Sequence, residues 1–497
     1  MSDEKRTSPA KPRKLRDVGQ WHRETDVAII GLGGAGGCAA IEAADAGSEV
    51  IVFELASAGG GSTALSSAEI YMGGSGGTRV QQACGFEDRT EDMVTYMMMC
   101  AGPQADEAKI RNYCENSAAH FQWLVDIGVP FKDSFQAERA IMCMTDDCLL
   151  YTGSEKAYPF VEHAKPCPRG HNLRVEGDNG GPLFMKIVCE NVEKRPNITV
   201  ECESRALQLI IDDDDRVAGL VVRQNQQELN VRARQGVILC AGGFVMNEEM
   251  VRKHAPMLTA GTVPIGNPGD TGSGILMGLS VGASAINMHE GFVSLPYYPP
   301  ASLTRGIVIN DKAQRFINED VYHGRLGAMA LRQESQRLYF IVTVEQYADY
   351  EQVSYLGAEV AGTGETVEEL ERELALSEGS LQHTIAVYNA DCERQQDTQW
   401  HKDAQWLEPL KPPLVALDVT PGRGAFIPFF TLGGLDTLPT GEVIDNDGQP
   451  IAGLYAAGRT ACGVVRRAEG YSSGMSVGDA TFSGRLAGKQ AAAAPRS

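Results

Sequence analysis

The sequence has few of the features that mark membrane proteins, secreted proteins or nucleic-acid-binding proteins. No apolar run approaches the roughly 18 residues of a membrane span, and the polar, basic N-terminus lacks a signal-peptide core. Basic residues are in the minority, with 44 Lys and Arg against 65 Asp and Glu and a net charge of -21. Nucleic acid and anionic membranes are polyanions and therefore unfavourable partners. We expect a cytoplasmic protein with no membrane span and no nucleic-acid partner.

The 12 cysteines form no regular framework. In a long chain without a secretory signal, scattered cysteines indicate reduced thiols, so we expect no structural disulfides. The cysteines and histidines of residues 143–148 and 163–171 have spacings that match no common zinc site, and we expect no metal. The chain has neither a C-x-x-C-H haem motif nor an iron-sulfur cysteine run, so we expect no second redox centre.

Length and patterning indicate several structural units. A chain of 497 residues is too long for one simple core, which predicts two or more domains. Residues 1–20, rich in Lys, Arg and Pro, are expected to form a mobile N-terminal arm. Residues 88–130 have a helical pattern that ends near Gly128. Residues 199–223 and 227–240 alternate like strands around the four aspartates Asp212–Asp215, which predict a solvated hairpin turn rather than a calcium site.

Residues 26–54 are the most informative segment because they predict a dinucleotide site. The apolar run Val27–Ile30 reads as a strand, and the helix expected from about 35 to 46 directs its N-terminal amides at phosphates. Three glycines supply the tight turn, the close approach of backbone to a pyrophosphate and the close packing of helix on strand: Gly31, Gly33 and Gly36. A second strand over 49–53 delivers Glu54, whose carboxylate can bind an adenosine ribose and disfavours the 2′-phosphate of NADP.

Other glycine-rich segments follow at intervals along the chain. Residues 59–77, GGGSTALSSAEIYMGGSGG, suit backbone that runs close to a large flat ligand, although such composition is also typical of a flexible surface loop. Buried strands that lead into glycine turns are expected at 236–244 and 451–465, and a further glycine-rich segment occupies 267–283.

As a set, these motifs resemble the two-domain flavoproteins of the fumarate reductase and 3-ketosteroid dehydrogenase superfamily over residues 24–491. The resemblance extends to three further strings: PRGH at 168–171, QRFINED at 314–320 and FTLGG at 430–434. It implies an α/β fold with an α+β cap. A Rossmann-type FAD-binding domain would comprise residues 21–287 and 431–497, and a substrate-capping catalytic domain would be inserted at 288–430.

The resemblance also implies that the nucleotide is FAD. Some relatives attach the flavin covalently through a histidine in the glycine-serine segment, but residues 59–77 contain none, so we expect non-covalent FAD. No second dinucleotide fold for NAD(P)H is visible, and the electron acceptor is not predicted. The residues implied to contact FAD are Gly31, Gly33, Gly34, Ala35, Gly36, Glu54, Leu55, Gly61, Ser62, Thr63, Ala206, Ala241, Gly242, Gly458, Gly474, Met475 and Ser476.

The sequence departs from fumarate reductases where those enzymes hold two carboxylates. Such a pocket needs histidines and arginines. The segment that resembles the family's H-T-x-G-G motif has Phe430 in place of the histidine. Tyr322 and His323 follow QRFINED, where the family continues to its catalytic arginine, and Arg325 lies slightly beyond. Tyr471 aligns with the family's other active-site arginine. The expected pocket is therefore apolar and lined with phenols, which disfavours a fumarate reductase.

Phenols suit the α,β-desaturation of a ketone. One hydroxyl can polarise the ketone, and a second can remove the acidified proton beside it while hydride leaves the neighbouring carbon for flavin N5. Tyrosines at both positions are typical of 3-ketosteroid dehydrogenases. Tyr471 is followed by two serines where 1-ene-forming enzymes usually have Y-P-G-x-G, and this string looks most like the Δ4-(5α)-dehydrogenases. The resemblance implies that Tyr471, with a backbone N–H near Gly474, donates to the 3-keto oxygen, and that Tyr322 and Ser473 remove the C4 proton. His323 is the alternative base.

A 3-keto-5α-steroid desaturated at C4–C5 is thus the expected substrate. Its apolar body would be bound largely by burial at about 25 cal/mol per Å². The expected substrate-binding residues are Phe292, Tyr297, Phe429, Phe430 and Gly474, although the aromatic side chains would serve equally well in plain cap packing. The alternatives are a Δ1-dehydrogenase, a fumarate reductase-like ene reductase, and a flavin-binding sensor or assembly subunit without activity. The exact steroid and the oligomeric state are not predicted.

Overall fold

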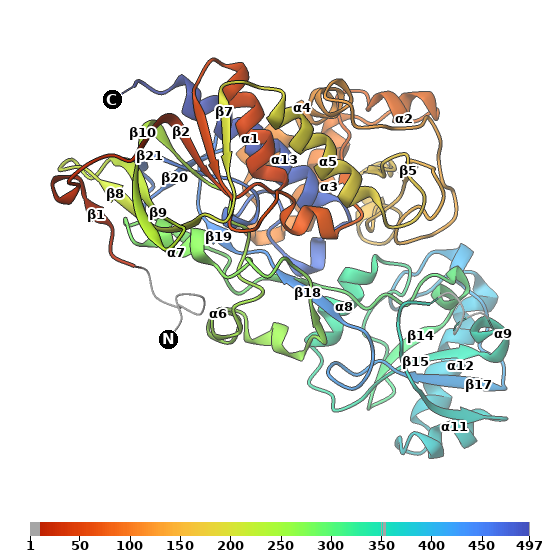
Figure 1. The fold of residues 1–497 in the computed structure, drawn as a ribbon. Coiled ribbons are helices and arrows are strands. Elements are labelled where there is room, and N and C mark those ends of the chain that lie inside the picture. Colours follow the sequence, from red (N-terminus) through yellow and green to blue (C-terminus); the bar gives the residue numbers. More distant parts are fainter. Residues whose placement is uncertain (1–9, 349, 351–353, 497) are drawn as a thin grey trace.

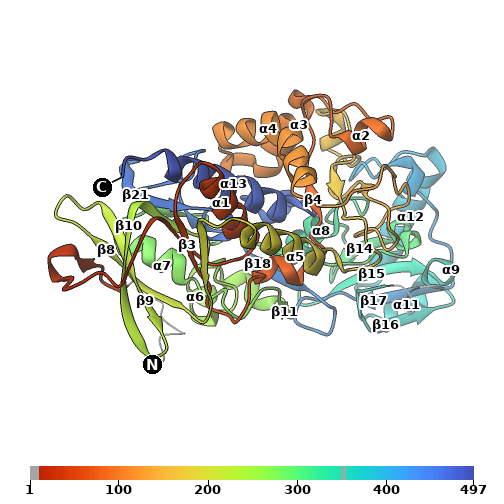
Figure 2. The same ribbon diagram turned by 45° about the horizontal axis from the view of Figure 1, so that its top comes forward.

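The computed structural model describes residues 10–348, 350 and 354–496. A nine-stranded sheet and a four-stranded sheet lie at opposite ends of the molecule (Figures 1 and 2). The strands are β1 Arg13–Lys14, β2 Arg23–Ile30, β3 Val50–Phe53, β4 Ile70–Tyr71, β5 Leu149–Leu150, β6 Gly170–His171, β7 Ile198–Glu201, β8 Arg205–Ile211, β9 Val217–Gln224, β10 Gln227–Leu239, β11 Val263–Pro264, β12 Ala285–Ile286, β13 Gly291–Val293, β14 Ile307–Asn310, β15 Leu338–Thr343, β16 Val360–Gly364, β17 Leu414–Asp418, β18 Pro428–Thr431, β19 Gly434–Leu435, β20 Glu442–Ile444 and β21 Pro450–Ala456. The α-helices are α1 Gly34–Asp45, α2 Arg79–Ala83, α3 Thr90–Ala101, α4 Glu107–Asp126, α5 Gly180–Glu193, α6 Glu248–His254, α7 Ser273–Leu279, α8 His323–Leu331, α9 Val344–Tyr347, α11 Val367–Glu373, α12 Ser380–Arg394 and α13 Met475–Ala493.

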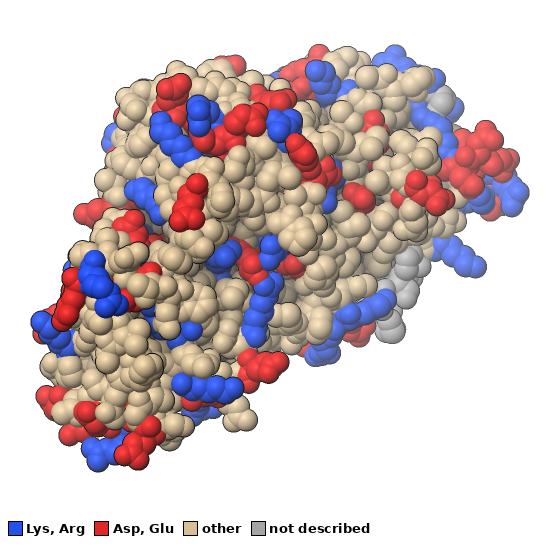
Figure 3. Space-filling view, turned by 180° about the vertical axis from the view of Figure 1, so that it is seen from behind, with Lys and Arg blue, Asp and Glu red and all other residues tan. Residues whose placement is uncertain are grey.

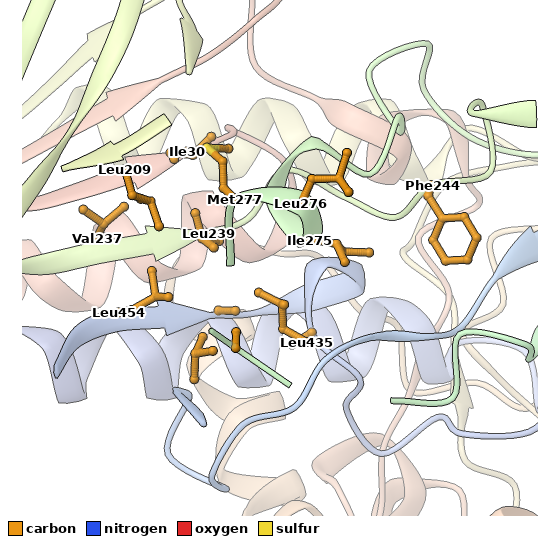
Figure 4. Close-up of a cluster of buried hydrophobic side chains, with 14 of the residues drawn as sticks. Ile30, Leu209, Val237, Leu239, Phe244, Ile275, Leu276, Met277, Leu435 and Leu454 are labelled. Carbon is orange, nitrogen blue, oxygen red and sulfur yellow. The ribbon is translucent and has the colours of Figure 1, made fainter. Parts of the chain in front are cut away.

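The large sheet is built around parallel strands with helices on both faces. Strands β7, β3, β2, β10 and β21 run parallel to their neighbours in that order, and the antiparallel β8 and β9 extend the sheet from β10. Alternate residues of each strand enter opposite cores. Val27 and Ile29 pack with helices α1, α5 and α13, whereas Ala28 and Ile30 face the core that contains α7 (Figure 4). Burial on both faces explains the continuous apolar runs of these strands.

The first and last helices pack lengthwise through small residues. A Cβ at Gly484 would overlap the backbone of Ala35, and one at Gly488 would overlap the backbone of Ala39. Glycine therefore allows α13 to lie directly against α1. The C-terminal segment completes the same layer as the first glycine turn.

Several local predictions can be compared with the structure. The hairpin turn at Asp212–Asp215 is confirmed, because β8 and β9 pair antiparallel on either side of it. The helical segment 88–130 is divided into α3 and α4, because Gly102 has a φ of +56° and Pro103 follows it. The predicted mobile arm differs in part. Residues 1–9 lie outside the described residues, but Arg13–Lys14 form β1 and pair with the edge strand β8.

The four-stranded sheet forms a second core. Its order is β14-β15-β17-β16, and α9, α11 and α12 lie beside it (Figure 1). The small sheet β11-β18-β13 lies where the chain leaves and re-enters the larger layer. All four strands of the second sheet fall inside the segment 288–430, and we propose to keep those limits for the cap.

The surface charges, the helices and the cysteines can be compared with the composition of the chain. Acidic and basic side chains are interspersed over the face in Figure 3. None of the helices in the described part of the chain combines the length and apolar character needed to cross a bilayer. All 12 cysteines are free thiols, and the described residues contain no group of three or more His, Cys, Asp or Glu side chains suited to a metal ion.

Candidate functional site

The glycine turn after β2 has the geometry that its sequence predicts. Gly31 has a φ of +97°, and a Cβ there would lie 2.5 Å from the carbonyl oxygen of Cys240. A Cβ at Gly36 would overlap the carbonyl oxygen of Gly31. By contrast, a Cβ at Gly33 would have no protein atom closer than 3.8 Å. The first two glycines are therefore required by the protein's own packing, and the Gly33 face is open toward a ligand.

The N-terminus of α1 can bind an anion. Gly33 is the N-cap residue and offers no side chain to the first amides of the helix. The glycine-serine segment runs beside it, because the Gly34 N–H donates to Thr63 Oγ1 at 3.2 Å and Gly61 lies against Gly33. The backbone of this segment therefore lies directly beside the glycine turn.

Glu54 lies at the end of β3 beside the same turn. One carboxylate oxygen accepts from the Leu32 N–H at 2.7 Å and the other accepts from the Ala56 N–H at 2.8 Å. Each oxygen keeps a further lone pair that can accept from a ribose hydroxyl. Leu55 beside it is 41 % exposed. Ala206 lies near the start of β8, just after Ser204, whose N–H donates to the Glu54 carbonyl oxygen.

Asp270 joins three of the predicted flavin-binding segments. It accepts from Ser62 Oγ at 2.5 Å and from Arg459 Nη2 at 2.6 Å. A Cβ at Gly242 would overlap the Asp270 carboxylate. Sequence reasoning included Asp270 only as part of the glycine-rich segment 267–283, and it did not find Arg459, which is adjacent to the predicted Gly458.

The remaining predicted residues lie at the same edge. Ala241 follows β10, and Gly458 follows β21 and packs against Ala35 of α1. Gly474, with a φ of +87°, begins α13 and accepts from the Tyr71 N–H at 3.1 Å. Met475 is buried in the first turn of α13. The carboxyl ends of β2, β3, β10 and β21 therefore converge with the N-termini of α1 and α13, which is where an open α/β sheet binds a nucleotide. The open glycine face, the uncapped amides and the acceptor carboxylate fit FAD.

Four aromatic side chains, three of them buried and one, Phe430, partly buried, form a cluster between this edge and the cap. The ring centroid of Phe292 lies 4.5 Å from that of Tyr471, 4.8 Å from that of Phe430 and 6.4 Å from that of Tyr322. Strands β13 and β18 place Phe292 opposite Phe430. The tyrosines come from the N-terminal end of α8 and from the segment before α13. The cluster is apolar and contains two phenols.

The hydroxyl groups of Tyr322 and Ser473 meet at this cluster. Tyr322 Oη donates to Ser473 Oγ at 3.2 Å. The segment 152–154 fixes both residues. Thr152 exchanges two hydrogen bonds with the Ser473 backbone, at 2.9 and 3.0 Å, and the Tyr322 N–H donates to Ser154 Oγ at 3.0 Å. The predicted pair is therefore brought together although its members are 151 positions apart.

The family model described as "FAD binding domain" matches residues 26–474. The chain belongs to the FAD binding domain family. The predicted FAD cofactor, the fumarate reductase-like flavoprotein fold and the classification as an FAD-dependent oxidoreductase are confirmed.

Individual relatives of this flavoprotein act on steroids or on fumarate. The crystal structure of a 3-ketosteroid-Δ4-(5α)-dehydrogenase from Rhodococcus jostii RHA1, in complex with 4-androstene-3,17-dione, is similar with a TM-score of 0.91 and 41% identity, covering 97% of this chain and 100% of that one. A 3-oxo-5-alpha-steroid 4-dehydrogenase of Comamonas testosteroni is 26% identical over 90% of this chain and 95% of its own length. A probable fumarate reductase of Shewanella frigidimarina is 27% identical over 94% of this chain and 75% of its own length.

Burial keeps the phenols of the flavoprotein neutral. It raises the pKa of Tyr322 well above its usual value, and it raises the pKa of Tyr471 to about 12, although hydrogen bonds with Ser476 oppose the rise. Both hydroxyls are therefore donors at neutral pH. The neighbouring His323 bonds Ser294 Oγ through Nδ1 at 2.6 Å, and burial lowers its pKa to about 3. Its imidazole is thus a weak base.

The structure adds one titratable group that sequence reasoning missed. Glu69 precedes β4 and is 3 % exposed, and the Ser473 side chain acts to lower its pKa. Burial raises its pKa to about 8. The residue lies inside the predicted glycine-serine segment, but no spacing in the sequence relates it to Ser473.

Two predicted substrate contacts lie apart from the aromatic cluster. The ring of Tyr297 packs on Phe340, and its hydroxyl donates to the Glu319 carbonyl oxygen, so it belongs to the core of the cap. Phe429 precedes Phe430 on β18 and faces the opposite side, against Gly261. These contacts are those of packing residues.

Proposed function

We propose that this flavoprotein desaturates a 3-keto-5α-steroid at C4–C5. The observation that carries the proposal is the hydroxyl pair of Tyr322 and Ser473 in one apolar cluster with the neutral phenol of Tyr471. A rigid hydrocarbon with a single ketone at one end matches this cluster, because apolar side chains would bind its body and the phenols would meet its polar end. The likeness to the Rhodococcus enzyme supports the same choice.

Tyr471 is proposed to activate the ketone. Its hydroxyl would donate to the 3-keto oxygen together with a backbone N–H near Gly474. Because its pKa is raised to about 12, the phenol keeps its proton and stabilises the negative charge that develops on the oxygen as the C4 proton leaves. The stacked rings of Phe292 and Phe430 pack against it.

Tyr322 and Ser473 are proposed to share the removal of the C4 proton. The segment 152–154 holds them in a fixed relation, so that no reorganisation is needed when the proton moves. FAD, when bound, supplies the acceptor for the hydride that leaves C5. The predicted glycine, Glu54 and Ser62 sites described above would hold it.

A fumarate-type reductase is the second candidate, supported by the Shewanella relative. A dicarboxylate would need free cations beside the cluster. Arg459 lies 5.3 Å from the Phe430 ring but is paired with Asp270 at 2.6 Å. Arg325 donates to the Glu469 carbonyl oxygen and lies near its carboxylate. These pairings favour the steroid over the dicarboxylate.

Anaerobic titration of the purified flavoprotein tests the proposal. 5α-Androstane-3,17-dione should bleach the flavin and yield the 4-ene product, whereas succinate should leave the flavin oxidised. Androst-4-ene-3,17-dione separates the Δ4 from the Δ1 reaction, because only a Δ1-dehydrogenase would be reduced by it. Bleaching by succinate at a comparable rate would refute the steroid assignment, and the absence of bleaching by all three compounds would favour a sensor or an assembly subunit.

A further inference from the structure

Glu69 is a buried carboxyl group whose surroundings do not satisfy it. It is 97 % buried, and Oε1 has no hydrogen-bond partner among the described residues. Buried polar atoms without a partner are rare and costly in folded proteins. The backbone around it is closely packed, since Gly170 leaves no room for a side chain beside Oε1. A carboxyl group in such an environment is costly for folding, which indicates a functional role.

The groups that face Glu69 come from four parts of the chain. Glu155 raises its pKa by charge repulsion, and Ser473 lowers it by a hydrogen bond. The ionised carboxylate in turn raises the pKa of Cys143, Tyr322 and Tyr471. None of the described groups that shift the Glu69 pKa is a Lys or Arg. Loss of the proton from Glu69 is therefore opposed by burial and is not stabilised by a cation.

The hydrogen bonds at Ser473 have a direction. Tyr322 donates to Ser473 Oγ, so the Ser473 hydroxyl proton is free to point to the Glu69 carboxyl group. Each donor in this chain strengthens the next. The proton removed from C4 needs a final acceptor, because Ser473 must lose its own hydroxyl proton when it gains the proton from C4. Tyr322 is neutral and donates to Ser473, so it can assist the transfer but is not the final acceptor. Burial lowers the pKa of His323 to about 3, which makes its imidazole a weak base.

We propose that Glu69 is the final acceptor of the C4 proton, which reaches it through Ser473; this inference rests on the proposed function. The C4–H bond breaks and a new O–H bond forms at Ser473 Oγ. The former hydroxyl proton of Ser473 passes to the Glu69 carboxylate. The electron pair of the C4–H bond becomes the second C4–C5 bond as hydride leaves C5 for the bound FAD. Because Glu69 acts through Ser473, it is a positioning residue for the base.

The pKa of about 8 suits this role. A proton acceptor is most effective when its pKa lies near the working pH. A higher pKa makes the carboxylate a stronger base, and a pKa no higher than the working pH leaves much of it ionised. The reaction should accordingly become faster as Glu69 loses its proton around pH 8.

The test measures the rate of anaerobic flavin reduction by 5α-androstane-3,17-dione on both sides of pH 8. The wild-type rate should rise through about pH 8 and then level. In Glu69→Gln the rate of flavin reduction should be lower by about 100-fold or more, and its rise with pH should be absent. Glu69→Asp should keep the rise with pH. Glu155→Gln should move the rise to lower pH, because it removes the repulsion that raises the Glu69 pKa. Glu371→Gln, a buried carboxyl group in the cap, is the matched control and should leave the profile unchanged.

Infrared titration gives a readout without turnover. The carbonyl band of a protonated buried carboxyl group should disappear near pH 8 in the wild type and be absent from Glu69→Gln. A wild-type rate and pH profile in Glu69→Gln would overturn the relay while the proposed function stands. A wild-type flavin that the steroid does not reduce would overturn both. If Glu69→Gln fails to bind FAD, an unshifted profile in Glu155→Gln overturns the relay.

Discussion

Glu69 should make the stability of the flavoprotein depend on pH in a way that one substitution removes. Its pKa is about 8 in the folded protein and 4.5 in an ordinary environment. Between these values the folded protein holds a proton that the unfolded chain has released. The contribution of Glu69 to stability is therefore fully present below pH 4.5, falls as the pH rises and is lost above about pH 8.

The pKa difference of 3.5 sets the magnitude. At about 1.36 kcal/mol for each pKa unit, it corresponds to about 5 kcal/mol in the free energy of unfolding. Unfolding entropy is about 2.1 cal/mol/K for each residue, or about 1 kcal/mol/K for a chain of this length. The effect on the melting temperature is thus about 5 °C.

Differential scanning fluorimetry of the wild type and Glu69→Gln across this pH range measures the effect. Glutamine is neutral at every pH, so the variant should gain about 5 °C relative to the wild type between acidic and alkaline buffer. Glu371→Gln should show no such gain over this range, because the pKa of Glu371 is lowered from 4.5 and its contribution to stability is lost only at lower pH. Burial raises the pKa of Glu371, but hydrogen bonds from the Gly379, Leu381 and Gln382 N–H groups and the Gln382 side chain lower it overall. A melting-temperature difference between wild type and Glu69→Gln that does not change with pH would refute the reasoning.

Three other outcomes are expected from the site. Tyr471→Phe should slow flavin reduction about 100- to 1000-fold with little change in steroid affinity, measured by stopped-flow and by binding titration; near wild-type rates would remove Tyr471 from the mechanism. Gly33→Val should fold with a wild-type circular dichroism spectrum but purify without FAD, since its Cβ meets no protein atom closer than 3.8 Å, and retained flavin would contradict the pyrophosphate assignment. Acid or heat should release FAD from the wild type into solution, because residues 59–77 hold no histidine for attachment; flavin that stays with the denatured polypeptide would contradict non-covalent binding.

The nucleotide half of the site could be predicted because its requirements are local. Gly31 and Gly36 must lack a Cβ for reasons set within a few residues and one neighbouring strand, so the sequence records them directly. Tyr322 and Ser473 could be placed together only through motifs whose spacing follows the family. The alternation of β18 could have separated Phe429 from Phe430, because neighbouring residues of a strand face opposite sides.

Glu69 could not be predicted, because its environment is made by distant parts of the chain. In the sequence it is one acid in a segment of glycine and serine, where a solvated carboxylate is the ordinary expectation. In the structure it is buried beside the backbone of Gly170, and Glu155 and Ser473 act on its pKa. The pKa of a carboxyl group depends on this enclosure and not on its neighbours along the chain.

The packing of α13 on α1 has a consequence for how the protein is made. The first glycine turn is synthesised early, but its helix is covered by Gly484 and Gly488 from the last helix. Strand β10 likewise lacks its pairing partner until β21 has been synthesised. A growing chain on the ribosome can therefore form the cap, whose sheet is complete at Asp418, before the nucleotide site has its C-terminal wall. The nucleotide site is therefore complete only after α13 has been synthesised.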